Sequence, residues 1–267
     1  GPDELRSLGE TEFANVMAAM SASGIYGPAR IAMRIVGNVD LRLGERLRPV
    51  LEAHVAAAGG RFAGVRMNTA YSEAGLFGGA CDPALRGVLR DPAFVAGARV
   101  LGEMGLVLDL WCLQGQLGDV AALADAVPNL VIVVDHCGTP ESHGPWRGRE
   151  AEGFADWAAR IGDLARRPNV RIKAGGLGMP LDAPITAATG PASGEELARR
   201  WRPVIETCIA AFTPARAMFE SNFPPDKAGG SYGATWNAFK IIAAAMSEPE
   251  KDRLFRRTAA ETYGIGI

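Results

Sequence analysis

Leu130-Val-Ile-Val-Val-Asp135-His136-Cys-Gly-Thr-Pro140 is an apolar run that ends abruptly in an acid and a histidine. A second stretch, Ala217-Met-Phe-Glu220-Ser-Asn222-Phe-Pro-Pro-Asp226-Lys227, has the same design. A run that is apolar on both faces is typical of a parallel strand covered by helices. Polar side chains at the carboxyl ends of such strands carry the chemistry of α/β enzymes. The two stretches therefore predict an α/β barrel or a doubly wound sheet, with its site at the strand ends.

Strand-like and helix-like patterns alternate along the rest of the chain. We predict strands at 31–36, 62–67, 106–111, 130–136, 170–174 and 217–222. We predict helices at about 10–23, with Thr11 as a candidate cap, and at 47–57, 91–105, 117–126, 154–166, 195–212, 236–246 and 248–258. This alternation indicates a parallel sheet. A closed (β/α)8 TIM barrel needs more strands, so we expect an N-terminally truncated barrel of about six βα units, an open sheet, or a barrel that another polypeptide completes.

The bulk properties limit the class of protein. The 267 residues, 48% of them hydrophobic, suit a single domain, 1–267, with a sizeable core. A net charge of -2 and a pI near 6.0 give no electrostatic reason to expect nucleic acid. The apolar runs are of strand length and no signal-peptide pattern opens the chain, so we expect no membrane span and a cytoplasmic location. The scattered cysteines form no CxxC pair, which is typical of reduced, buried thiols.

The alternation of side chains along a strand brings candidate site residues together, with Glu220 and Asn222 as candidates for substrate binding and His136 as a candidate catalytic residue. It places Glu220 and Asn222 on one face, and it places His136 opposite Asp135. If Glu220 and Asn222 point into the barrel, they meet His136, which can act as general base, general acid or metal ligand. The plainer alternatives are a structural histidine and a glutamate paired with Arg or Lys. Asp226 is either a catalytic group or the cap of the next segment.

Two cations and an amide near other strand ends are candidate binding residues. The guanidinium of Arg66 suits bidentate capture of a substrate carboxylate, with a structural ion pair as the alternative. Lys173 is a cation inside an apolar strand pattern, which suits a developing oxyanion or a carboxylate partner. Gln114 lies just beyond the strand 106–111 and is a candidate for substrate binding or for loop stabilisation. The Gly- and Pro-containing stretch 175–193 is expected to be a long loop that walls the site.

The sequence gives little support for a metal or a nucleotide. His54 is expected to be exposed on a helix, and His143 lies in a loop where we expect it to be solvated, or a site residue if the loop moves. No HxH, HExxH or Cys/His cluster is present, and one histidine with scattered carboxylates does not specify zinc. No GxGxxG or GxxxxGK[ST] motif is present either.

A series of short motifs along nearly the whole chain resembles one family. In chain order they are Gly9-Glu-Thr-Glu-Phe13, Tyr26-Gly-Pro28, Ile35-Val-Gly37, Asp40-Leu41, Arg61-Phe-Ala-Gly-Val-Arg66, Gln116-Leu117, Asp135-His-Cys-Gly138, Pro168-Asn-Val170, Lys173-Ala-Gly-Gly-Leu-Gly-Met179 and Phe219-Glu-Ser-Asn-Phe-Pro224. Each piece is weak alone, but their order is rather specific. The chain resembles the metal-dependent hydrolases of the amidohydrolase superfamily, in the amidohydrolase 2 group of TIM-barrel enzymes that includes lactonases and related decarboxylases.

The resemblance also shows where this chain departs from the family. The family usually opens with a strand ending in His-x-His, which supplies two metal ligands, and neither this strand nor a second early strand is present in the sequence. Met67 and Gln114 stand where members often carry histidine, and Asn222 stands where they carry aspartate. His136 matches the family and would be the ligand if a divalent metal, Zn or Mn, is bound. Some lactonases of the group work without a metal, and we expect no cofactor here.

The hypothesis that accounts for these residues together is that the protein is a hydrolase acting on a small, carboxylated lactone or cyclic ester. His136 or Asp226 would activate water. Arg66 would orient a substrate carboxylate, and Lys173 would counter the charge on the carbonyl oxygen. The expected partner is this small-molecule substrate, with neither nucleic acid nor a membrane.

Two rival functions remain open from the sequence. The chain could be a catalytically impaired relative or a fragment that serves as a binding subunit, because an incomplete barrel exposes strand edges that recruit a second copy or another chain to complete it. It could also be a lyase that decarboxylates aromatic acids, because the fold does not fix the reaction.

Overall fold

The computed structural model describes residues 2–181 and 192–266. Within these ranges it forms one sheet of six parallel strands in the order β1-β2-β3-β4-β5-β6. The strands are β1 (Ile35–Asn38), β2 (Phe62–Asn68), β3 (Val107–Trp111), β4 (Ile132–Val134), β5 (Val170–Gly175) and β6 (Ala217–Glu220). This sequential order is that of successive βα units in a TIM barrel. The predicted α/β fold with about six visible βα units is confirmed.

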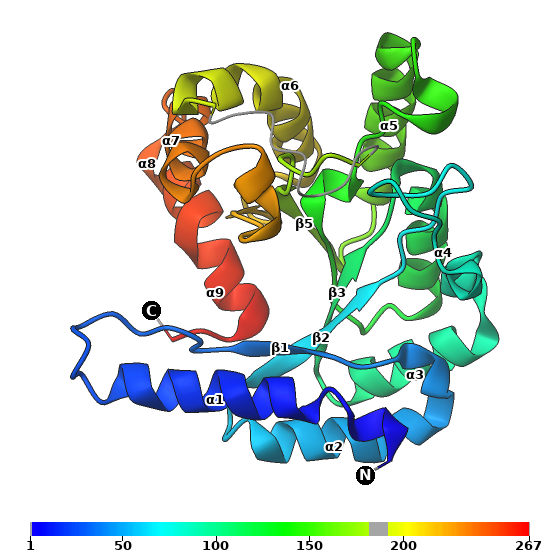
Figure 1. Cartoon of the computed structure of the whole chain (residues 1–267), viewed down its shortest axis with the longest axis vertical. Helices are drawn as coiled ribbons and strands as arrows, with labels where there is room; N and C mark the ends of the chain where they lie inside the picture. Colours follow the sequence, from blue (N-terminus) through cyan, green and yellow to red (C-terminus); the bar gives the residue numbers. More distant parts are fainter. Residues whose placement is uncertain (1, 182–191, 267) are drawn as a thin grey trace.

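Helices flank the curved sheet, and those that connect successive strands line its outer side (Figure 1). They are α1 (Leu8–Ala22), α2 (Leu47–Ala57), α3 (Pro92–Glu103), α4 (Leu117–Ala126), α5 (Glu150–Leu164), α6 (Gly194–Phe212), α7 (Tyr232–Ile242), α8 (Glu248–Asp252) and α9 (Thr258–Tyr263). The start of α3 follows the sequence closely, because the Asp91 side chain accepts a hydrogen bond from the backbone nitrogen of Ala93 at 2.8 Å and Pro92 occupies the first turn.

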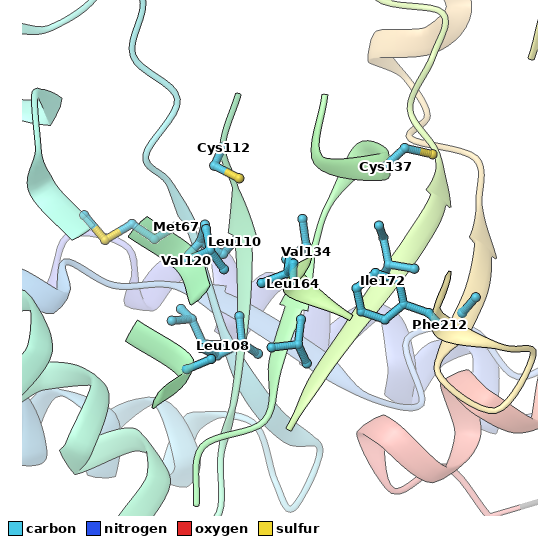
Figure 2. Close-up of a cluster of buried hydrophobic side chains, with 14 of the residues drawn as sticks. Met67, Leu108, Leu110, Cys112, Val120, Val134, Cys137, Leu164, Ile172 and Phe212 are labelled. Atoms are coloured by element: carbon cyan, nitrogen blue, oxygen red, sulfur yellow. The ribbon is translucent and has the colours of Figure 1, made fainter. Parts of the chain in front are cut away.

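The main core lies between the outer face of the sheet and the helices. Leu108 and Leu110 of β3 point to this side with Val134 of β4, where they meet Val120 of α4 and Leu164 of α5 (Figure 2). All of these side chains are buried. Full burial of a side chain of this size stabilises the fold by about 1.5–3 kcal/mol, so this layer fixes the sheet that carries the site.

The inner face of the sheet is different, because it carries charges above a thin apolar layer. Val107, Val133 and Met218 form a small buried cluster near the amino ends of β3, β4 and β6. Two positions further along β3 is Asp109, which is buried and forms an ion pair with Lys173 of β5. Strand alternation sends these residues to the same face, so the charged layer lies directly on the apolar one.

The last helix, α9, is tied to both sides of the sheet. The Thr258 hydroxyl donates to the carbonyl oxygen of Pro214, just before β6, at 2.7 Å. The Nε of Arg34, just before β1, donates to the carbonyl oxygen of Gly264 at 2.8 Å. Figure 1 shows α9 passing between these two edges of the sheet. This position brings Tyr263 to the inner face, where it packs against the apolar cluster.

Some local expectations are wrong. Thr11 does not cap α1, because the helix begins at Leu8, and the Thr11 hydroxyl instead lies 2.8 Å from Nδ1 of His54. His54 was expected to be exposed but is fully buried, because α1 packs against α2. Burial accordingly lowers the pKa of His54. Of the predicted loop 175–193, positions 182–191 lie outside the described residues.

Two further features bear on what the chain can do. In the described ranges, no helix is both long enough and apolar enough to cross a membrane. All four cysteines are free thiols, with Cys112, Cys137 and Cys208 buried and Cys81 only partly covered.

Candidate active site

Glu220, at the end of β6, holds His136 just beyond the end of β4. One carboxylate oxygen, Oε1, accepts a hydrogen bond from the backbone nitrogen of His136 at 2.8 Å and lies 2.6 Å from Nδ1 of its ring. The other ring nitrogen, Nε2, lies 3.0 Å from Nη2 of Arg66. A guanidinium can only donate, so this arrangement assigns the ring proton to Nδ1 and makes Nε2 an acceptor. The structure thus brings three of the predicted site residues together.

The backbone around His136 is built for this arrangement. His136 and Cys137 both have φ 56°, in the left-handed region that non-glycine residues rarely adopt. Such conformations concentrate at functional sites. Gly176 makes room for the ring, because a Cβ atom at this glycine would lie 2.2 Å from Nδ1 of His136. The turn therefore fixes the imidazole at the mouth of the strands.

The same turn overturns the predicted faces of Asp135 and His136. The two were expected on opposite faces, yet both contact Arg66, whose Nε lies 3.0 Å from Oδ2 of Asp135. The physical reason is that β4 ends at Val134, so the alternation of a strand no longer applies.

Asn222 also lies beyond its strand, because β6 ends at Glu220 and Asn222 has φ 47°. Its side-chain nitrogen donates to Oδ1 of Asp226 at 2.7 Å. The backbone nitrogen of Gly178 donates to the other oxygen of Asp226 at 3.2 Å. Asn222 thus contacts Asp226, and the predicted convergence of Asn222 with His136 stays a prediction.

Lys173 of β5 lies next to the Glu220–His136 pair, between the carboxylates of Asp109 and Asp135. Its Nζ is 2.6 Å from Oδ2 of Asp109, 2.9 Å from Oδ1 of Asp135 and 4.0 Å from Oε2 of Glu220. The alternative of a carboxylate-bound lysine, considered from the sequence, is therefore realised. Lys173 thus connects Asp109, on the inner face of the sheet, to the Glu220–His136 pair.

These contacts set the ionisation of the site. Burial would raise the pKa of Glu220, but the neighbouring His136 outweighs it and lowers the pKa to about 2. Burial would lower the pKa of His136, but Glu220 outweighs it and raises the pKa. Burial would also lower the pKa of Lys173, but Asp109 and Asp135 raise it well above its usual range. Glu220 and Lys173 are thus both charged at neutral pH.

Asp226 behaves in the opposite way. Its side chain is buried, and this burial raises its pKa to about 6, although the hydrogen bond from Asn222 acts against the shift. A carboxyl group that titrates near neutrality can serve as an acid or as a base. The predicted role as a simple cap of the following segment does not explain such burial.

A cavity of about 540 Å³ opens beside His136. Its walls come from the segment after β4, the segment after β5 and helix α6, and they include Glu141, His143, Leu177 and Trp201. His143 was expected to be solvated but is buried, 3.6 Å from Glu141. The part of the predicted loop that the structure describes does wall the cavity, as expected.

A second cavity, of about 510 Å³, lies on the side of Arg66. It is also lined by Trp111, whose ring centroid is 6.0 Å from that of His136 in an edge arrangement. The side chain of Arg66 is 46% exposed. The guanidinium is therefore the group of the site that a ligand entering from this side meets.

Gln114 fits the loop-stabilising alternative. Its amide nitrogen donates to the carbonyl oxygen of Gly153 and to Asp156, both at 2.9 Å, and its oxygen accepts from the backbone nitrogen of Glu141 at 3.0 Å. The side chain is completely buried. Gln114 therefore holds the wall of the first cavity in place.

Sequence reasoning missed one residue of the site and undervalued two. Asp135 was recognised only as a strand-end acid and Asp109 was given no role, although both bind Lys173. Tyr263 was missed entirely, yet its hydroxyl lies 2.9 Å from Oδ1 of Asp109. The positions of the two acids in apolar strands were a usable signal, whereas a tyrosine near the end of the chain gave none.

The donor set does not fit a metal centre. Within 2–181 and 192–266, no group of three or more His, Cys, Asp or Glu side chains is placed to hold an ion. Nε2 of His136 faces a guanidinium, and Asp135 lies between Arg66 and Lys173. The side chains of Arg66 and Lys173 thus occupy the places beside His136 and Asp135 where a metal ion would have to bind.

Comparison with known proteins gives consistent results. A family model described as Amidohydrolase matches residues 26–265. The uncharacterized protein y4mH of Sinorhizobium fredii is 33% identical over 231 residues, which is 86% of this chain and 69% of the relative. The L-fucono-1,5-lactonase of Burkholderia multivorans is 27% identical over 184 residues, which is 68% of this chain and 59% of that enzyme.

A solved structure matches the fold closely. It is an amidohydrolase from Burkholderia multivorans with bound zinc, and it aligns with a TM-score of 0.74 and 26% identity over 97% of this chain and 80% of that chain.

Proposed function

This chain belongs to the amidohydrolase family, and we propose that it hydrolyses a small, carboxylated lactone or cyclic ester by attack of an activated water molecule. The observation that carries the proposal is the Glu220–His136 pair at the edge of the first cavity, with Nδ1 of His136 held at 2.6 Å by a carboxylate.

The pair has the geometry of a histidine base supported by a carboxylate. Glu220 accepts a hydrogen bond from the Nδ1–H group, which leaves Nε2 as the proton acceptor of the neutral ring and stabilises the imidazolium that forms when Nε2 takes a proton. In the proposed reaction, Nε2 removes a proton from water, and the water oxygen bonds to the lactone carbonyl carbon. The ring C–O bond then breaks, and the imidazolium returns the proton to the leaving oxygen. The product is the open-chain hydroxy acid.

Arg66 has two roles in this proposal. In the structure its Nη2 lies on Nε2 of His136, and its exposed side chain can move. A carboxylate is a stronger partner for a guanidinium than a neutral imidazole, because the hydrogen bonds are charge-assisted and bidentate. A carboxylated substrate would therefore draw Arg66 away, orient itself against it and uncover Nε2 for water.

Lys173 and Asp226 complete the proposed machinery. Lys173 already binds Asp109 and Asp135, so its positive charge acts on the carbonyl oxygen from below rather than by replacing these partners. Asp226, whose pKa is raised to about 6 by burial, is the second candidate for activating water or protonating the leaving oxygen.

The cavity and the comparisons support a small cyclic substrate. The cavity beside His136 measures about 540 Å³ and the one beside Arg66 about 510 Å³, and both volumes lie in the range of small-molecule sites. One relative carries the name L-fucono-1,5-lactonase, which favours the lactone over other esters. The donor set does not fit a metal, so no step is assigned to one.

The experiment is turnover of a panel of five- and six-membered lactones, with and without a carboxyl group, by the wild type and by His136→Asn. We expect the variant to lose at least about 100-fold in kcat/KM, the usual contribution of a general base. His54→Gln, which changes a buried histidine between α1 and α2, is the matched control. Unchanged kcat/KM in His136→Asn would remove the proposed base. Carbon dioxide release from an aromatic acid, without lactone opening, would replace the hydrolase by a decarboxylase.

A further inference from the structure

Two groups compete for the carboxylate of Glu220. His136 lies 2.6 Å from Oε1, and the ammonium of Lys173 lies 4.0 Å from Oε2. Lys173 stays at this longer distance because Asp109 holds it at 2.6 Å and Asp135 at 2.9 Å. A lysine that moved onto Glu220 would take the carboxylate that orients His136, because a full cation is the stronger partner.

The hold of Asp109 on Lys173 depends in turn on a residue of α9. The hydroxyl of Tyr263 lies 2.9 Å from Oδ1 and 3.0 Å from Oδ2 of Asp109. The ring of Tyr263 also lies under the lysine, with Nζ 5.9 Å from the ring centroid. Tyr263 therefore contacts both members of the Asp109–Lys173 pair.

Asp109 needs this support because it is buried in the inner face of the sheet. Burial raises its pKa, whereas the ammonium of Lys173 and the hydrogen bond from Tyr263 favour the ionised form. A buried carboxylate that loses a hydrogen-bond donor pays the cost of an unsatisfied charge or takes up a proton. Either change weakens its attraction for Lys173.

We propose that Tyr263 is a positioning residue of the active site, which keeps Lys173 on Asp109 and so leaves Glu220 to His136. The inference rests on the proposed function, because it takes the Glu220–His136 pair to be catalytic. It also gives α9 a task beyond packing, since the contacts of Thr258 and Gly264 place Tyr263 at the inner face.

The test is Tyr263→Phe, which removes one hydroxyl and keeps the ring. We expect kcat to fall about 5- to 50-fold with KM changed less than about twofold, because substrate binding by Arg66 is untouched. The NMR signal of the Nδ1 proton of His136, far downfield in a short bond to a carboxylate, should move upfield. Asp109→Asn should give a larger loss. Adding Tyr263→Phe to Asp109→Asn should change nothing more, because the tyrosine acts through this acid.

Thr262→Val is the matched control, since its hydroxyl donates within α9, to the carbonyl oxygen of Thr258 at 2.6 Å, and not to the Asp109–Lys173 pair. An unchanged kcat and an unmoved His136 signal in Tyr263→Phe would overturn the inference. Unfolding of Tyr263→Phe, seen by circular dichroism, would also overturn it, because the hydroxyl would then hold the fold rather than the site. If His136→Asn retains full turnover, the proposed function fails first. If His136→Asn is inactive and Tyr263→Phe is normal, the role of Tyr263 alone fails.

Discussion

Oε1 of Glu220 binds both the backbone nitrogen and the Nδ1 atom of His136, although 84 positions separate the two residues in the chain. This double contact fixes the main chain and the ring of the histidine with one oxygen. It also explains why the imidazole can be held without a flexible loop, because Glu220 is the last residue of β6.

Glu220→Gln keeps the size of the side chain and removes its charge. We expect kcat to fall about 100-fold or more, because an amide neither stabilises the imidazolium nor fixes the ring proton on Nδ1. KM should change little. Steady-state kinetics with the best lactone of the panel checks this, and Glu141→Gln on the cavity wall serves as the comparison. Equal kcat in wild type and Glu220→Gln would mean that the pair is structural.

Arg66→Met should raise KM for a carboxylated lactone about 10- to 100-fold, since hydrogen bonds to charged groups contribute about 1.5–3 kcal/mol. KM for a lactone of the same ring size without the carboxyl group should stay the same. Arg90→Met is the control, because Arg90 binds Asp119 on the surface. A parallel rise in KM for both lactones would argue against recognition of the carboxylate.

Asp226 should make the stability of the protein depend on pH. Its pKa is raised from 3.8 to about 6 in the folded state, so the folded state favours the protonated form. The stability it contributes is complete below about pH 3.8 and is lost as the pH rises towards 6. Asp226→Asn does not lose this stability. Above pH 6 its free energy of unfolding should therefore exceed that of the wild type by up to about 3 kcal/mol, and this difference should be absent at pH 4. Thermal unfolding at a series of pH values measures the difference, and an advantage that does not grow with pH would contradict it.

Gly176→Ala should disable the site by a steric clash with His136 rather than by a change of charge. The added Cβ would lie 2.2 Å from Nδ1 of His136, and φ is +69° at this glycine. The ring must move off Glu220, so we expect at least a tenfold loss of kcat, together with lower stability. Gly118→Ala in α4, where no atom lies within 4 Å of the new Cβ, should leave kcat unchanged. Normal turnover in Gly176→Ala would show that the close approach is not needed.

Removal of divalent metal should leave turnover unchanged, because Arg66 and Lys173 occupy the sides of His136 and Asp135 from which an ion would bind. Metal analysis of the purified protein, followed by dialysis against a chelator and assay, checks this. Stoichiometric zinc or manganese, with activity lost on chelation and restored by the metal, would contradict the proposed metal-free reaction.

Much of the fold follows from local pattern. Apolar runs such as the one before Asp135 predict buried strands, and Asp91-Pro92 marks a helix start that the structure confirms. The predicted strand 31–36 is wrong in its first half, because β1 begins only at Ile35 and the side chains of Ile31 and Met33 are exposed. The pairing of Glu220 with His136 was also predictable, because both residues close parallel strands whose carboxyl ends share one edge.

The rest depends on contacts that no local pattern encodes. The left-handed turn at His136 cannot be read from the sequence, since histidine and cysteine rarely adopt positive φ. Burial of His54 follows only from the packing of α1 on α2. Tyr263 meets Asp109 across 154 positions. Such long-range partners are set by the packing of helices on the sheet, and therefore emerge only with the structure.

The thiols differ in burial, so one of them can be labelled selectively for spectroscopy. Cys81 is partly accessible, whereas the other three cysteines are enclosed, so a maleimide dye added to the native protein should attach at this single position. Cys81 belongs to the segment between β2 and α3, whose Phe77 packs near Trp111 at the strand ends. The emission of such a dye would report whether this segment changes position when a lactone is added.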